Sequence, residues 1–197
     1  SWRSLDGDLN FDDVDREVSF GRMQGTPLMI DGVLYMITSL NQVAAIDAVT
    51  GQTLWSFNPE VYRNGAPVGA LGFHQRGVAY WKDGDEQRIL VSTNDGFVYS
   101  LKLEDGSVDS NFANGRIDLT NGIPRATRDE LDYLGSQPLG SVSPPIVVGN
   151  ILVVSQITSN RPRFKERPPL WIRGYDIRSG ETVWTFHTIP LEGEFGN

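Results

Sequence analysis

The chain has 197 residues, 39% of them hydrophobic, and a formal net charge of -8. This length and composition allow a packed core and exclude a disordered chain. The acidic balance, without any stripe of Lys and Arg, argues against nucleic acid as a partner, because phosphate binding depends on clustered cations. Apolar runs such as "PPIVVGNILVV" are interrupted by Gly and Asn, so no segment is expected to span a membrane. Cys is absent, which excludes disulfides and thiolate chemistry.

Short runs rich in Val, Ile, Tyr, Phe and Trp follow one another along the chain, divided by Asp-Gly, Gly-Asn and Ser-Gly turns. Such turns supply the positive φ angles of tight hairpins, and the pattern predicts an all-β protein. We expect residues 1–20 to form the end of a preceding blade and its connecting loop. Three four-stranded blades follow at 21–60, 75–119 and 141–190, and the third contains an insertion at 156–170.

An internal repeat organises these strands. "AIDAVTGQTLW" ends at Trp55 and "GYDIRSGETVW" ends at Trp184, each with Asp and Gly at matching places. The intervening "LKLEDGSV" keeps the turn glycine, Gly106, but lacks the Trp, whereas the opening "SWRSL" places Trp2 among similar neighbours. Repeats of this kind are typical of a β-propeller, and we expect about three blades of a larger ring.

The recurring Trp and its turn have a physical explanation. An indole buries about 150–250 Å², and its N–H needs an acceptor. On the outer strand of one blade it would wedge against the next blade, where the turn Gly leaves room for the ring. The Asp of the repeat would accept hydrogen bonds from the turn amides. The repeat is therefore interpreted as a packing device between blades and not as a catalytic site.

The spacing A-x-D-x-x-x-G-x-x-x-W, in blades separated by long loops, resembles the tryptophan-docking repeats of quinoprotein dehydrogenases. "QGTPLMIDGVLYM", "RGVAYW" and "WTFHTIPLEGEFGN" strengthen this resemblance, the last two towards the membrane-associated, glucose-dehydrogenase-like branch. The resemblance implies an eight-bladed propeller that uses pyrroloquinoline quinone (PQQ). Because the chain begins without Met and ends abruptly, we expect both ends to be cuts in a longer polypeptide.

The resemblance assigns four residues to the cofactor. Arg76 would hold a carboxylate of PQQ, since a guanidinium is a planar and permanently charged donor; the alternative is a loop Arg lying over Trp81. Gln24, Ser143 and Ser155 would offer an amide and two hydroxyls. For these three the alternative is an ordinary position at a strand edge.

The resemblance also implies a calcium ion. Glu166 would be its ligand, because a hard cation prefers carboxylate oxygens; the alternative is a solvated loop. The family's catalytic Asp lies beyond Asn197, so we expect no catalytic residue here and no turnover by this segment alone.

The function implied for the whole protein is oxidation of an alcohol or an aldose by hydride transfer to PQQ with Ca²⁺ assistance, in the periplasm. Ubiquinone or a cytochrome would take the electrons. The alternative is a non-catalytic propeller that serves as a scaffold for other proteins.

Overall fold

In the part of the chain that the structure describes, twelve strands form three four-stranded antiparallel sheets, each in chain order. We call them blades 1 to 3. Blade 1 consists of β1 (Leu28–Ile30), β2 (Val33–Ile37), β3 (Val43–Asp47) and β4 (Thr53–Phe57). Blade 2 consists of β5 (Ala79–Asp83), β6 (Glu86–Ser92), β7 (Phe97–Lys102) and β8 (Ile117–Asp118). Blade 3 consists of β9 (Ile146–Val148), β10 (Ile151–Val154), β11 (Ile172–Asp176) and β12 (Thr182–Phe186).

The computed structural model describes residues 5–69, 71–129, 131, 135–159 and 167–196. Trp2 lies outside these residues, so its expected place in a preceding blade stays a prediction. Three 3-10 helices occur within them: η1 (Leu5–Asp8), η2 (Val61–Arg63) and η3 (Ala113–Gly115). No helix of the described part is long and apolar enough to cross a membrane.

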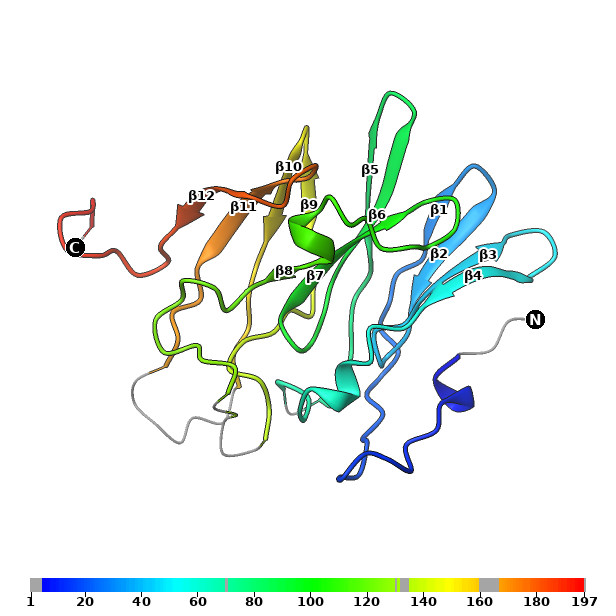
Figure 1. Cartoon of the computed structure of the whole chain (residues 1–197), viewed down its shortest axis with the longest axis horizontal. Coiled ribbons are helices and arrows are strands. Elements are labelled where there is room, and N and C mark those ends of the chain that lie inside the picture. Colours follow the sequence, from blue (N-terminus) through cyan, green and yellow to red (C-terminus); the bar gives the residue numbers. More distant parts are fainter. Residues whose placement is uncertain (1–4, 70, 130, 132–134, 160–166, 197) are drawn as a thin grey trace.

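The blades lie side by side, with blade 2 between the other two (Figure 1). The β1–β2, β5–β6 and β9–β10 hairpin turns point to one end of the sheets, at the top of the view, whereas the long connections gather at the opposite end. We call that second end the loop end. Long polar loops on a rigid sheet scaffold are where binding residues are usually found.

Blade 2 is apolar on both faces, because alternate residues of a strand point to opposite sides of the sheet. In β6, Ile89 and Val91 pack against blade 1, whereas Leu90 packs against blade 3. In β7, Tyr99 packs against blade 1 and Val98 against blade 3. The near-continuous apolar sequence of β6 and β7 therefore reflects a sheet that is covered on both sides.

Trp55 joins blade 1 to blade 2 as the repeat predicts. Its indole N–H donates to the Leu103 carbonyl of blade 2 at 2.9 Å. Its ring lies so close to Gly106 that a Cβ built there would be 2.5 Å from a ring carbon, and Gly106 has a φ of 71°. Both the contact and the backbone angle therefore favour Gly in this turn.

The Asp residues of the repeat hold their turns together. Asp47 Oδ1 accepts hydrogen bonds from the backbone N–H groups of Val49 and Thr50, at 3.0 and 2.6 Å. Asp176 Oδ1 accepts the equivalent bonds from Arg178 and Ser179, at 3.0 and 2.8 Å. These amides stabilise the ionised form, so the pKa of each Asp is lowered.

Between blades 2 and 3 the contact is made differently. At the place that corresponds to Trp55 over Gly106, Ala113 lies over Gly180: a Cβ at Gly180 would be 2.7 Å from the Cβ of Ala113. The Ala113 N–H donates to the Ser179 carbonyl at 2.8 Å. An indole still crosses this interface, but from the inner strand β5, where Trp81 donates to Asn150 Oδ1 at 3.1 Å.

The outer face of blade 3 repeats the face that blade 1 turns towards blade 2. Trp184 packs on Gly174 of the neighbouring strand and keeps 39% of its surface exposed. Ile146, Val148 and Phe186 are exposed on the same blade. Their counterparts in blade 1 are packed against blade 2, so the sequence repeat is also a repeat in structure.

Candidate cofactor-binding site

Three segments that precede the inner strands meet at the loop end. We call 24–27, 75–78 and 141–145 the lead-in segments; they run into β1, β5 and β9. The Thr26 N–H donates to the Arg76 carbonyl at 2.8 Å, and the Arg76 N–H donates to the Val142 carbonyl at 3.2 Å. The backbone of Arg76 therefore bonds to the lead-in segments of both neighbouring blades.

The side chain of Gln75 holds the three lead-in segments in place. Its side chain is only 1% exposed, and its amide donates to the carbonyl oxygens of Ser92 and Ser141, at 2.5 and 3.3 Å. Its amide oxygen accepts the Arg76 N–H at 2.8 Å. A buried amide with these bonds satisfied holds the backbone of Arg76 in one position. Sequence reasoning missed Gln75, although it stands beside Arg76 in "HQRGVAYW".

The Arg76 side chain is exposed, and its Nη1 donates to the Ser143 hydroxyl at 3.4 Å. Two of the residues assigned from the sequence, Arg76 and Ser143, thus lie together. The guanidinium that lies over Trp81 is that of Arg178, 5.0 Å from the ring centroid. The assignment of Arg76 to the cofactor stays a prediction. Among the described residues no carboxylate forms an ion pair with Arg76.

The other assigned residues are less closely joined. Gln24 is exposed and precedes Thr26 in its lead-in segment. Ser155 is exposed directly after β10, and no hydrogen bond within the described part joins it to Arg76 or Ser143. Glu166 lies outside the described residues. The assignments of Gln24 and Ser155 to a cofactor stay predictions.

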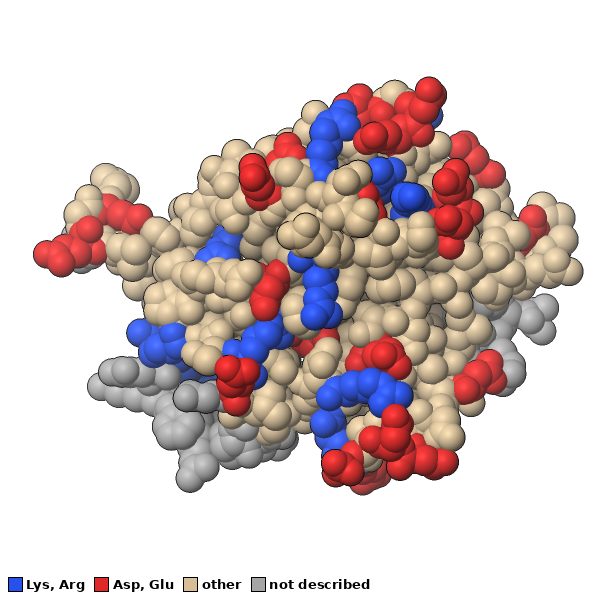
Figure 2. All heavy atoms as spheres, in the orientation of Figure 1, with Lys and Arg blue, Asp and Glu red and all other residues tan. Residues whose placement is uncertain are grey.

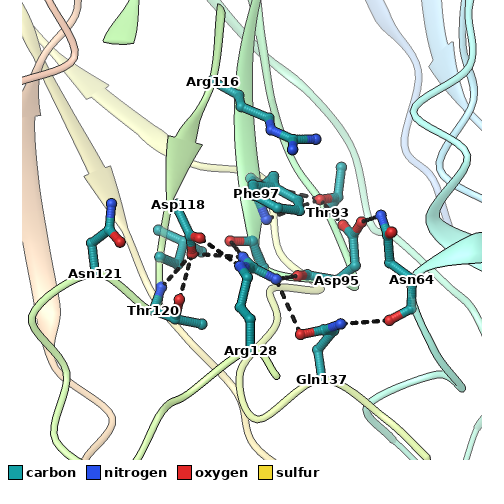
Figure 3. A network of polar contacts seen from close by, with 12 residues as sticks. Asn64, Thr93, Asp95, Phe97, Arg116, Asp118, Thr120, Asn121, Arg128 and Gln137 are labelled. Carbon is teal, nitrogen blue, oxygen red and sulfur yellow. Dashed lines mark hydrogen bonds and ion pairs between the residues drawn. The ribbon is translucent and has the colours of Figure 1, made fainter. Parts of the chain in front are cut away.

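A second polar network braces the loops at the same end (Figure 3). The side chain of Asp95 accepts hydrogen bonds from Thr93 at 2.5 Å and Asn64 at 2.8 Å. Burial raises the pKa of Asp95. Arg128 pairs with Asp118 at 2.5 Å and donates to the Asp95 carbonyl at 2.7 Å. Sequence reasoning did not foresee this network, since its members are far apart along the chain.

Three blades with their inner strands side by side and their long loops at one end define a segment of a β-propeller. The sequence model of the family "PQQ: Glucose/ethanol/alcohol dehydrogenase, beta-propeller domain" matches residues 1–196. The chain belongs to this family, which confirms the resemblance drawn from its repeats.

Curated relatives and solved structures agree with this family. The chain is 31% identical over 169 residues to the dehydrogenase subunit of the quinone alcohol dehydrogenase of Gluconacetobacter polyoxogenes, covering 85% of this chain and 20% of that protein. It is 28% identical to quinoprotein glucose dehydrogenase A of Acinetobacter calcoaceticus, covering 95% of this chain and 24% of that protein. The chain thus spans a fifth to a quarter of these relatives.

Among solved structures, quinohemoprotein alcohol dehydrogenase from Comamonas testosteroni has a TM-score of 0.66 at 22% identity, covering 88% of this chain and 22% of that one. A europium-containing methanol dehydrogenase has a TM-score of 0.59 at 18% identity, covering 86% and 25%. At these identities the similarity shows the fold, and the fold is that of the propeller dehydrogenases.

The donors at the lead-in segments suit a ligand that carries carboxylates. An exposed guanidinium without a carboxylate partner, next to a hydroxyl, can form charge-assisted hydrogen bonds with such a group. A calcium site is a different matter. No group of three or more His, Asp or Glu side chains within the described residues could hold a metal ion. These residues therefore fit an anionic cofactor and do not by themselves form a metal site.

Proposed function

We propose that the chain is part of a PQQ-dependent dehydrogenase that oxidises an alcohol or an aldose sugar. The family supports the class of enzyme, and the position of Arg76 supports the cofactor contact. When bound, PQQ accepts a hydride from the carbon that is oxidised. Alcohol and glucose dehydrogenases both occur among the relatives, so both substrate classes belong to the proposal.

The observation that carries the proposal is the bonding of three blades around one arginine. Thr26, Gln75 and Val142 each form a hydrogen bond with the backbone of Arg76. Since three hydrogen bonds hold the backbone of Arg76, the Cα from which its side chain extends has a fixed position at the loop end. A preorganised guanidinium loses less conformational entropy when it binds a carboxylate. In this proposal Arg76 binds and orients PQQ, and Ser143 and Gln24 add neutral hydrogen bonds.

Further parts of the proposal rest on the family resemblance and, for calcium, on a residue outside the described part of the chain. In this proposal Glu166 is a ligand of the calcium ion. Ubiquinone or a cytochrome accepts the electrons, and the protein acts in the periplasm. The segment contributes one flank of the pocket and no catalytic base. Consequently these 197 residues, supplied with PQQ, Ca²⁺ and glucose, should give no turnover. A measurable turnover would contradict this part of the proposal.

The test of the cofactor contact is PQQ binding by the full-length protein with Arg76→Ala. Loss of a charge-assisted contact should weaken PQQ binding by roughly 10- to 100-fold while the circular dichroism spectrum is kept. Arg22→Ala is the matched control, because Arg22 is also exposed and lies outside the lead-in segments. Unchanged PQQ binding in Arg76→Ala, or a wild-type protein that binds no PQQ, would favour the scaffold alternative.

A further inference from the structure

The position of the Arg76 guanidinium depends on the backbone from which it extends. Within the described residues no carboxylate forms an ion pair with it. Acidic side chains gather instead at the β5–β6 hairpin turn of blade 2, which lies at the other end of the sheet and at the top of Figure 2. The hydrogen bond from its Nη1 to the Ser143 hydroxyl is long, at 3.4 Å. The contacts that fix the backbone of Arg76 therefore also determine where its guanidinium can bind a ligand.

The side-chain amide of Gln75 bonds to three different segments. Its Nε2 donates to the Ser92 carbonyl at the end of β6, at 2.5 Å, and to the Ser141 carbonyl in the lead-in segment of blade 3, at 3.3 Å. Its Oε1 accepts the Arg76 N–H at 2.8 Å. The same N–H also donates to the Val142 carbonyl, at 3.2 Å. The bond to Gln75 is thus the shorter of the two that hold this N–H.

Ser92 extends this connection to Ser143, the second residue assigned to the cofactor. Ser92 is the last residue of β6 and is fully buried. Its hydroxyl donates to the Ser143 carbonyl at 2.9 Å, while its own carbonyl accepts the amide of Gln75. The backbones of Arg76 and Ser143 are therefore both linked to the end of β6, the first through Gln75 and the second through the Ser92 hydroxyl.

The surroundings of Gln75 require both donors and an acceptor. An amide supplies two N–H donors and a carbonyl acceptor, whereas a carboxylate supplies acceptors only. Gln75 is 1% exposed, so bulk water does not compete for these bonds. The segments around it are also close together, because a Cβ built at Gly77 would lie 3.5 Å from the Thr26 carbonyl oxygen and 3.7 Å from Pro144 Cγ. A change at Gln75 is therefore expected to affect the lead-in segments of all three blades.

We propose that Gln75 is a positioning residue for the cofactor. By fixing the backbones of Arg76 and Ser143 it sets the distance between the guanidinium and the hydroxyl, and thereby the affinity for a carboxylate of PQQ. The identity of this ligand rests on the proposed function. The amide of Gln75 is buried and occupied by its own bonds, so it acts only through these two neighbours. Donors that are held in place before binding lose less conformational entropy when the ligand arrives.

The first test is calorimetric titration of the full-length protein with PQQ, for wild type and for Gln75→Ala. Loss of the amide should weaken PQQ binding about tenfold, because Arg76 and Ser143 are no longer held in one arrangement. Gln52→Ala is the matched control and should leave the affinity unchanged. Gln52 is exposed in the turn between β3 and β4, at the end of blade 1 that is opposite to the lead-in segments.

A second readout does not need the cofactor. Hydrogen exchange of the protein without PQQ, measured by mass spectrometry, reports how firmly the backbone amides of the lead-in segments are bonded. In Gln75→Ala the amides of 75–78 and 141–145 should exchange faster than in wild type. Ser92→Ala should speed exchange in 141–145 alone, because it removes the hydroxyl that bonds to Ser143 and keeps the carbonyl that bonds to Gln75.

Gln75→Glu adds a readout in the pH dependence of PQQ binding. When protonated, the new carboxyl can donate one hydrogen bond and still accept the Arg76 N–H. When ionised, it can only accept, and it then faces the carbonyl oxygens of Ser92 and Ser141. Burial and these oxygens disfavour the ionised form. The affinity for PQQ should therefore be close to that of wild type at about pH 5 and several-fold weaker at about pH 9.

The reference at each pH is the affinity of wild type and of Gln52→Glu. The ionisable neighbours in the chain, His74, Arg76 and Asp95, are the same in all of these proteins, so their titration cancels in the ratio of affinities. Gln52→Glu introduces the same charge at an exposed position and should follow wild type at both pH values.

Each outcome decides the inference. Weaker PQQ binding by Gln75→Ala, with faster exchange in the lead-in segments, supports it. Faster exchange with unchanged affinity would overturn it, because Gln75 would then support the fold alone. A wild-type protein that binds no PQQ contradicts the proposed function as well, whereas binding that is equal in wild type and Gln75→Ala contradicts only the inference. If Gln75→Ala does not fold, Gln75→Glu decides: an affinity relative to wild type that is the same at both pH values overturns the inference.

Discussion

Neighbouring blades are joined by different contacts at the two interfaces of this chain, blade 1 with blade 2 and blade 2 with blade 3. At the first, Trp55 of the outer strand reaches a carbonyl of the next blade and its ring covers Gly106. At the second, Ala113 covers the turn, while the indole comes from Trp81 on the inner strand. The comparison shows that one interface can lack the Trp of the repeat and still contain an indole from another strand.

The largest effect is expected for Trp81→Ala. The side chain is 3% exposed and packs within the cluster that joins blades 2 and 3. Its removal should lower the free energy of unfolding by about 4 kcal/mol, measured by chemical denaturation and circular dichroism. Trp81→Phe keeps most of the buried area and should cost less. A loss for Trp81→Ala smaller than that for Trp184→Ala, at an exposed indole, would contradict the role given to Trp81.

A smaller effect is expected at the first interface. Trp55 is only partly buried, so Trp55→Ala should cost about 3 kcal/mol. Gly106→Ala should also destabilise the protein, because the new Cβ would meet the indole and the backbone φ is positive. In the double variant the steric part of the Gly106 effect should vanish, since the ring is gone. Additive losses in a double-mutant cycle would show that the two residues do not contact each other.

How much of this was predictable can be judged at particular residues. The strands and the turns at Gly51, Gly106 and Gly180 follow from local pattern, because a positive φ and a short apolar run are properties of neighbouring residues. The docking of Trp55 followed from the repeat. The replacement of a Trp by Ala113 did not, because it depends on how a connection folds back in space.

The candidate site shows the same division. The sequence resemblance assigned Arg76 and Ser143 to one cofactor; in the structure their side chains form a hydrogen bond, and the cofactor contact itself stays a prediction. It missed Gln75, whose role is visible only once its amide is seen to bond to two other strands. It also missed the pairing of Arg128 with Asp118, since residues ten positions apart in a loop and a strand meet only in the folded chain.

The smallest expected effect is on the stability of the protein at low pH, through Asp47 in the turn between β3 and β4. The pKa of Asp47 lies below its ordinary value of 3.8 in the folded chain, chiefly because backbone amides donate to it. A lowered pKa means that the stabilisation is present above about pH 4 and is lost as the pH falls through the folded value. Blade 2 has Lys102 at this place; in its turn a different carboxylate, Asp105, accepts the Ser107 N–H at 2.8 Å and has a lowered pKa.

The check compares wild type with Asp47→Asn by urea denaturation at pH 3 and pH 6. The variant should lose less stability on acidification than the wild type, because one carboxylate no longer has to be protonated. Lys82→Gln is the control: it changes an exposed charge on β5, away from the Asp47 turn, and should leave the acid dependence of wild type unchanged. Identical pH profiles for wild type and Asp47→Asn would show that the turn amides do not stabilise this carboxylate.

The most direct measurement of the central claim is a crystal structure of the full-length protein with PQQ. The account predicts the guanidinium of Arg76 within about 3 Å of a PQQ carboxylate, with the lead-in segments joined as they are here. A quinone bound elsewhere, with Arg76 directed away from it, would contradict the account.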